Sequence, residues 1–212
     1  SIEDAFSMGE IIIVDKSVAI KLFECDDFQI NLKTKSRYRM LPCATVSGND
    51  VLEGLRCDRA EVKYKNRSIT LNRPILAISK TPLPDGSRGE WECACEDIYQ
   101  GVQKLCQLGA PAELETLTAG GVREVCGAAF TREAYEVQTG QGRLEIALDL
   151  GVLLGGGREM PLCEVEVELK EGPMEAADAF AIDLARAFGL KPERRSKFQR
   201  ALALARGEAN GI

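Results

Sequence analysis

An alternating stretch in the last third of the chain, from Cys163 to Lys170, restricts the fold more than any other feature. Its sequence, CEVEVELK, places Glu164, Glu166 and Glu168 on one side of a β-strand, because successive strand side chains point to opposite faces. The three carboxylates would then stand about 7 Å apart along the strand. Such a row is repulsive at neutral pH unless water or cations face it. The stretch therefore predicts either a solvated sheet face or a cation-binding one.

The composition is that of a globular protein that does not bind nucleic acid. The 212 residues are 45% apolar and 28% charged, with a formal net charge of −6. This allows a sizeable core and disfavours non-specific binding to phosphate backbones. The chain has eight cysteines but no histidine, which excludes zinc-finger spacing and any catalytic arrangement that needs histidine. We expect no secretory leader, reduced thiols and a cytoplasmic location. No apolar run in the sequence has the roughly 18 residues needed to span a membrane.

Most of the chain shows short alternating segments bounded by turn residues, which predicts antiparallel strands. We expect strands at 10–14, 18–23, 28–32, 60–65, 75–80, 88–95, 143–150 and 163–170, and two strands or one bent strand over 122–137. Asp97 is suited to cap a helix that ends at Gln107, and 111–118 should form a further helical turn. After Gly172 the apolar period becomes 3.6, which predicts a helix from Pro173 to just before Gly189. A last helix is expected from about residue 193 to 206.

These elements predict a single α+β domain built around an antiparallel sheet. Nearly every expected strand carries charged residues on one side. Such a sheet must either expose that side to water or close into a barrel with a polar interior. We favour the closed barrel.

The inward side of this barrel would collect charges of both signs. Its cations would be Lys33, Lys63, Lys80, Arg88 and Arg132, and its anions Glu90, Glu145, Asp149, Glu164, Glu166 and Glu168. This is too much charge to bury unpaired. A phosphate polyanion with Mg²⁺ or Mn²⁺ would balance it, because lysine and arginine bind phosphate oxygens while carboxylates bind the metal. Any one of the cations alone is more simply explained as a surface residue. Their repetition across several strands favours a binding site.

Three motifs follow one another near the C-terminal end of the chain. They are LEIALDLG at 144–151, CEVEVEL at 163–169, and Ser196-Lys197 at the expected start of the last helix. In order and spacing they resemble the CYTH family of triphosphate tunnel metalloenzymes, in particular its bacterial inorganic triphosphatases. The resemblance extends upstream through 78–80, 88–90 and 130–133, and it covers roughly residues 60–206.

The resemblance implies an eight-stranded antiparallel β-barrel, a tunnel flanked by helices. Residues 1–212 would form one domain of this family, with 1–59 matching its pattern poorly. The implied substrate-binding residues are Lys33, Lys63, Lys80, Arg88, Arg132 and Lys197. The implied ligands of Mg²⁺ or Mn²⁺ are Glu90, Glu145, Asp149, Glu164, Glu166 and Glu168. Glu166, Glu168 and Lys197 are the candidates for catalytic roles.

The N-terminal region departs from the family pattern. The first strand of the family usually carries Glu-x-Glu-x-Lys, and the nearest counterpart here is Gln29-Ile30-Asn31-Leu32-Lys33. The lysine is kept, but amides replace both carboxylates. Amides ligate divalent metals less well than carboxylates, so the implied metal site would be weakened.

The resemblance implies metal-dependent hydrolysis of a triphosphate, whether inorganic triphosphate or a nucleoside or thiamine triphosphate. One alternative is a non-catalytic polyphosphate or nucleotide-binding module, which the two amides favour. Others are an adenylate cyclase of the same fold and a structural protein with solvated sheet faces. We expect a small triphosphate-containing partner, and neither nucleic acid nor a membrane. A homodimer is among the oligomeric states that the sequence leaves open.

Overall fold

The computed structural model describes residues 11–13, 30–45, 51–64, 67–69, 75–82 and 88–208, with side chains at 55, 77, 79 and 89–208. The strands are β1 (Ile11–Ile13), β2 (Ile30–Thr45), β3 (Val51–Tyr64), β4 (Arg67–Ile69), β5 (Ile75–Pro82), β6 (Arg88–Cys95), β7 (Val122–Glu124), β8 (Cys126–Gln138), β9 (Arg143–Gly155), β10 (Arg158–Glu171) and β11 (Lys191–Glu193). The helices are α3 (Ile98–Gln107), α4 (Glu113–Thr118), α5 (Met174–Phe188) and α6 (Lys197–Ala205). The strand expected at 18–23 lies outside the described residues.

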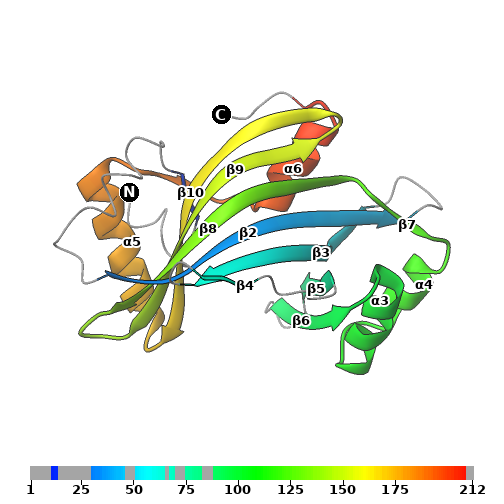
Figure 1. Ribbon diagram of the computed structural model, residues 1–212, viewed down its shortest axis with the longest axis horizontal. Helices are drawn as coiled ribbons and strands as arrows, with labels where there is room; N and C mark the ends of the chain where they lie inside the picture. The colour runs from blue at the N-terminus through cyan, green and yellow to red at the C-terminus, as the bar shows by residue number, and fades with distance from the viewer. Residues whose placement is uncertain are drawn as a thin grey trace.

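All the described strands belong to one antiparallel sheet, whose long members curve together in Figure 1. The strand order is β11-β1-β10-β9-β8-β2-β3-β5-β6, with β4 paired to β3 and β7 paired to β2. The prediction of an α+β fold with an antiparallel sheet is confirmed. The prediction of a closed eight-stranded barrel is wrong for the described residues, because the sheet has 11 strands and no pairing joins β6 to β11. At the β8–β9–β10 end of the sheet, the buried charged side chains are paired across neighbouring strands and with α6, so closure is not required to satisfy them there.

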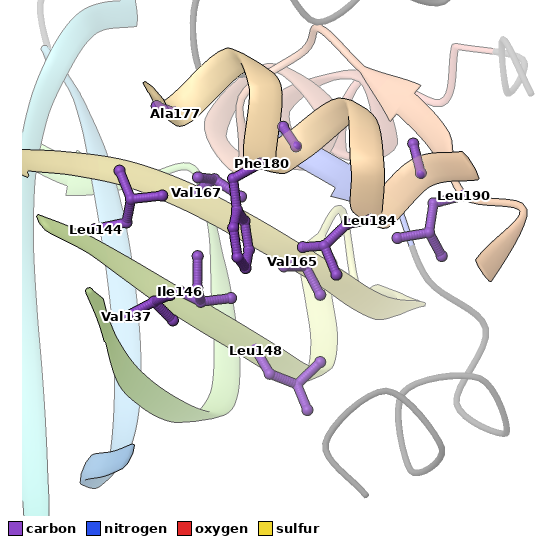
Figure 2. Packing of buried hydrophobic residues seen from close by; sticks show 12 residues of the cluster. Val137, Leu144, Ile146, Leu148, Val165, Val167, Ala177, Phe180, Leu184 and Leu190 are labelled. Atoms are coloured by element: carbon purple, nitrogen blue, oxygen red, sulfur yellow. The ribbon is translucent and has the colours of Figure 1, made fainter. Parts of the chain in front are cut away.

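Helix α5 covers one face of the sheet at its β8–β9–β10 end. Its buried residues pack against apolar side chains of these strands, and Figure 2 shows Phe180 and Leu184 directed toward Ile146 and Val165. The predicted helix is confirmed. Pro173 precedes its first turn, and Gly189 ends it in the left-handed conformation with φ of 64°. Glycine adopts this conformation without steric cost, which explains why the helix stops there.

A second layer, formed by α3 and α4, packs on the other end of the sheet. Asp97 caps α3 as predicted, because its side chain accepts a hydrogen bond from the backbone N–H of Gln100 at 2.9 Å. Val102 and Leu105 of α3 pack against Leu55 and Ala77. The two helical layers leave the middle of the sheet between them (Figure 1).

Glycine at position 101 allows α3 to lie close to the sheet. A Cβ atom added there would lie 2.6 Å from the Cβ of Ala77 and 2.9 Å from the Sγ of Cys95. We expect Gly101→Ala to lower the free energy of unfolding by about 1–2 kcal/mol, because overpacking outweighs the roughly 1 kcal/mol gained in helix propensity. Chemical denaturation measures this. Gly140→Ala is the control, since nothing lies within 4 Å of the added atom, and an equal loss in both variants would contradict the packing argument.

Helix α6 packs on the opposite face from α5, over β8, β9 and β10. Its Ala201 and Leu202 contact Ala128 and Leu153 of the strands. At Gly155, an added Cβ would lie 2.5 Å from the backbone oxygen of Ala201, so this glycine sets how closely the helix approaches β9. The helix begins later than predicted. Residues Lys191–Glu193 form strand β11, and a capping box at Ser196 starts α6.

Within the described ranges, no helix is long and apolar enough to cross a membrane. Cys93 and Cys106, whose side chains the structure describes, are free thiols. This agrees with the expectation of reduced thiols at these positions.

Candidate functional site

Three carboxylates converge on the sheet face that α6 covers. Asp149 of β9 and Glu164 of β10 are directly opposite each other in the antiparallel register, and Glu166 follows two residues later. One oxygen of each carboxylate lies within 4.8 Å of the others. The side chains of Asp149 and Glu164 are completely buried, whereas that of Glu166 is 29% exposed. The cluster is therefore a deep acidic site with one member that solvent can reach.

Arg132 of β8 extends the same row across a third strand. It is paired with Asp149 in the register, just as Asp149 is paired with Glu164. Its Nε and Nη2 atoms donate to the two oxygens of Asp149, both at 2.7 Å, and Nη2 also donates to Glu166 at 3.2 Å. This two-pronged geometry is the strongest form of arginine–carboxylate pairing.

Helix α6 supplies two further cations to the cluster. The Nζ atom of Lys197 lies 2.8 Å from Asp149 Oδ2 and 2.6 Å from Glu166 Oε1, and it also contacts Glu164 Oε1. Arg200 donates from Nη2 to the other oxygen of Glu164. Both cationic side chains are 6% exposed. The first turn of α6 thus acts as a cationic cover over the acidic strands.

The start of α6 is fixed by local hydrogen bonds. The Ser196 hydroxyl accepts from the backbone N–H of Gln199 at 3.1 Å, and the Gln199 side chain accepts from the backbone N–H of Ser196 at 3.0 Å. This capping box satisfies two backbone donors that a helix start leaves free. It sets the position at which Lys197 enters the site.

The cluster shifts the pKa values of two members. Burial disfavours the charged form of Lys197, but Glu166, Asp149 and Glu164 together outweigh it and raise the pKa of this lysine. Burial also raises the pKa of Glu164, and the nearby Glu166 adds to this effect, while Lys197 and Arg200 oppose it. The Oε1 atom of Glu164 is buried without a partner in hydrogen-bond geometry among the described atoms, although the Lys197 ammonium lies at ion-pair distance from it.

An aromatic ring forms the apolar wall of the site. The ring centre of Phe130 lies 5.1 Å from the Nζ atom of Lys197 and 5.6 Å from the guanidinium carbon of Arg132. These distances are within the range of cation–π interaction. Gly151 is paired with Phe130 across the strands, and a Cβ at this glycine would lie 2.6 Å from the Phe130 Cα atom. Glycine at 151 is therefore needed for the ring to occupy this place.

The structure brings together five of the residues predicted from the sequence: Arg132, Asp149, Glu164, Glu166 and Lys197. Glu145 and Glu168 are paired with each other further along the strands. The side chain of Glu168 is 62% exposed and forms an ion pair with Lys170 at 3.2 Å. These two glutamates lie outside the cluster, and their predicted roles remain predictions.

The register also places the predicted residues of β5 and β6. Lys80 is directly opposite Glu90, and Arg88 is opposite Pro82. Residues paired across neighbouring strands share a face of the sheet. A row of such pairs leads from β8 through β2 and β3 to β5: Ala128–Met40, Met40–Asp58 and Asp58–Leu76. By this path Lys80, Arg88 and Glu90 take the same face as Arg132, at the far side of the sheet. Their participation in the site remains a prediction.

Two predicted cations have register positions that differ from the expected alternation. Lys63 of β3 is paired with Lys35 of β2. Lys35 is in turn paired with Glu133 of β8, the residue next to Arg132. Because successive residues of a strand lie on opposite faces, the register places Lys63 on the face opposite that of Arg132. At Lys33 the register between β2 and β8 shifts, so the alternation that grouped this lysine with Asn31 is interrupted there.

Two residues of the site, Arg200 and Phe130, were not predicted from the sequence. Arg200 follows Lys197 by three residues, which in a helix puts both on one side. Phe130 precedes Arg132 by two residues, which in a strand puts both on one face. Each spacing is visible in the sequence, but nothing in the composition marks these residues as partners of the acidic strand.

The donor set fits a hard divalent cation. Mg²⁺ and Mn²⁺ prefer carboxylate oxygens, and three of these converge here from Asp149, Glu164 and Glu166. The buried Oε1 atom of Glu164 lies against the Lys197 ammonium, so a metal ion held by this oxygen would take the place of the lysine.

The comparisons with known proteins agree with this geometry. The sequence matches the CYTH domain over residues 78–202, more than half of its length. The chain belongs to the CYTH domain family. Its matched region contains Arg132, the three clustered carboxylates, Lys197 and Arg200. The family assignment made from the sequence motifs is therefore confirmed.

Solved structures of CYTH-fold proteins share the fold of this chain. The PH1819 protein of Pyrococcus horikoshii OT3 is 19% identical with a TM-score of 0.55, and the match covers 93% of this chain and 98% of that protein. HpAC1 from Hippeastrum, named for adenylyl cyclase and described as having a dominant triphosphatase activity, is 15% identical with a TM-score of 0.53. That match covers 93% of each chain. At these identities the likeness shows a common fold.

Proposed function

We propose that this CYTH protein hydrolyses a triphosphate in a metal-dependent reaction. The observation that carries the proposal is the convergence of Asp149, Glu164 and Glu166 with Arg132 and Lys197 on one sheet face. The triphosphatase activity described for HpAC1, which has the same fold, supports it. Inorganic triphosphate and nucleoside or thiamine triphosphates are the candidate substrates.

The residues divide into three roles. Asp149, Glu164 and Glu166 would hold Mg²⁺ or Mn²⁺, which when bound neutralises phosphate charge and polarises the phosphorus centre. Arg132 and Lys197 would donate to phosphate oxygens, because both are cationic and lie at the cluster. Glu166, the most exposed of the three carboxylates, would accept a proton from the attacking water. The far-side residues Lys80 and Arg88 would extend the phosphate-binding surface, and Glu90 would be a further metal ligand.

A phosphate-release assay with inorganic triphosphate and Mg²⁺ or Mn²⁺ tests the proposal. We expect metal-stimulated release in the wild type and a loss of about 100-fold or more in Glu166→Gln, which cannot accept the proton. Glu159→Gln is the matched control, because Glu159 is an exposed glutamate on the same strand. Its turnover should equal that of the wild type.

Two outcomes would contradict the proposal in different ways. Unchanged turnover in Glu166→Gln would remove the role given to this residue. Tight triphosphate binding without metal-stimulated release would instead indicate the non-catalytic binding module. The amides at Gln29 and Asn31, where the family usually has carboxylates, are the feature that favours that second function.

A further inference from the structure

The position of Lys197 within the acidic cluster is unusual for a substrate-binding lysine. Its Nζ atom lies at the point where Asp149, Glu164 and Glu166 meet, at 2.8 Å from the first and 2.6 Å from the third. An ammonium group has three N–H donors, and here three carboxylates surround it. The lysine therefore occupies the place that the three carboxylates offer to a metal ion.

The charges of the site are already balanced without a metal. The three carboxylates carry three negative charges, and Arg132, Lys197 and Arg200 carry three positive ones. A divalent ion added beside the lysine would leave two excess positive charges in a site that is largely buried. Two cations a few ångströms apart in such surroundings repel strongly. The metal and the lysine ammonium thus compete for the same oxygens.

The aromatic ring of Phe130 can hold the amine of Lys197 when it leaves the carboxylates. Its amine already lies 5.1 Å from the centre of the Phe130 ring, whose face attracts cations. A lysine stem is flexible, so the amine can move while the capped start of α6 stays in place. Arg200 remains bound to Glu164 and keeps the helix attached to the strand.

We propose that the ammonium of Lys197 is a resident cation that a divalent metal ion displaces, so that metal binding frees this lysine for the phosphates. The inference rests on the proposed function, because it assigns the freed lysine to the triphosphate of that reaction. It also implies reciprocity. Triphosphate that holds the lysine away from the carboxylates tightens metal binding, and metal that releases the lysine tightens triphosphate binding.

Calorimetric titration of Mn²⁺ in the absence of triphosphate tests the displacement. We expect Lys197→Met to bind Mn²⁺ about tenfold more tightly than the wild type, a typical size for coupled binding events. Lys170→Met is the matched control, because Lys170 also contacts a glutamate of β10, namely Glu168, but lies outside the cluster. Its affinity should stay within about twofold of the wild type. Equal or weaker binding by Lys197→Met would overturn the inference.

Amine labelling of the wild-type protein provides a second measurement that does not depend on the folding of a variant. N-hydroxysuccinimide acetate should modify Lys197 several times faster with Mg²⁺ than without it, measured by mass spectrometry relative to the exposed Lys191. Labelling that Mg²⁺ leaves unchanged would overturn the inference. Metal-stimulated phosphate release alongside unchanged labelling would show that the proposed function holds while the displacement does not. Absence of any Mn²⁺ binding in the wild type and in Lys197→Met would contradict both.

Discussion

Replacing Phe180 with alanine is expected to lower the free energy of unfolding by about 3–5 kcal/mol, the largest stability loss that we predict for one substitution. Phe180 projects from α5 into the buried cluster that contains Ile146 and Val165 (Figure 2). Truncation removes a large apolar surface from this cluster and leaves a cavity that the long strands beneath it cannot fill by collapsing. Chemical denaturation followed by circular dichroism measures the change.

Met174→Ala is the control for this prediction. Met174 lies on the same helix, but it is 49% exposed to solvent. We expect its truncation to change stability by no more than about 0.5 kcal/mol. An equal loss in both variants would contradict the packing argument, because both substitutions raise helix propensity and only Phe180 is buried against the sheet.

Replacing Arg200 with methionine should cost about 3 kcal/mol, the second largest effect. Methionine retains much of the apolar stem but removes the guanidinium that donates to Glu164. The Glu164 side chain is completely buried, and a buried ion pair broken on one side leaves an uncompensated charge. Lys197 still contacts this carboxylate, which keeps the expected loss at the lower end of the range for such pairs.

The loss in Arg200→Met should depend on pH. Burial raises the pKa of Glu164 and Arg200 opposes this rise, so removing Arg200 raises the pKa further. A carboxyl group whose pKa is higher in the folded state destabilises the fold above that pKa and stops doing so as the pH falls through it. The difference from the wild type should therefore be largest at pH values above the raised pKa of Glu164 and shrink as the pH falls toward the ordinary range of a glutamate. Arg206→Met, which removes an exposed arginine at the end of α6, should show neither the loss nor the pH dependence.

The parts of the fold set by local pattern could be predicted from the sequence. The glutamates of β10 alternate with Val165 and Val167, and this alternation alone assigns them to opposite faces. The limits of α3 and α5 follow from Asp97 and Gly189, because capping residues act within a few positions of themselves. The family resemblance, which rests on the order of the three motifs, implies that Lys197 lies in the site with the acidic strand.

The parts that depend on pairing between distant segments could not be predicted in this way. Alternation predicts the same face, and so the same role, for Glu164, Glu166 and Glu168. The register with β9 and the position of α6 bring the first two into the buried cluster and leave Glu168 outside it. The short β11 is not predicted, and its last residue, Glu193, falls at the expected start of the last helix, since three residues carry too little periodicity to distinguish a strand. Alternation grouped Lys63 with Arg132, whereas the register of β3, β2 and β8 pairs it by way of Lys35 with Glu133, and its role in substrate binding remains a prediction.

The order of the site residues along the chain has a consequence for synthesis on the ribosome. Glu166 and Lys197 are 31 positions apart, so translation at about 5–20 residues per second produces the carboxylates roughly 2–6 s before their lysine. During that interval β9 and β10 carry their acidic residues without the cations of α6. With Arg132 alone to balance them, the three carboxylates carry two excess negative charges until α6 supplies Lys197 and Arg200.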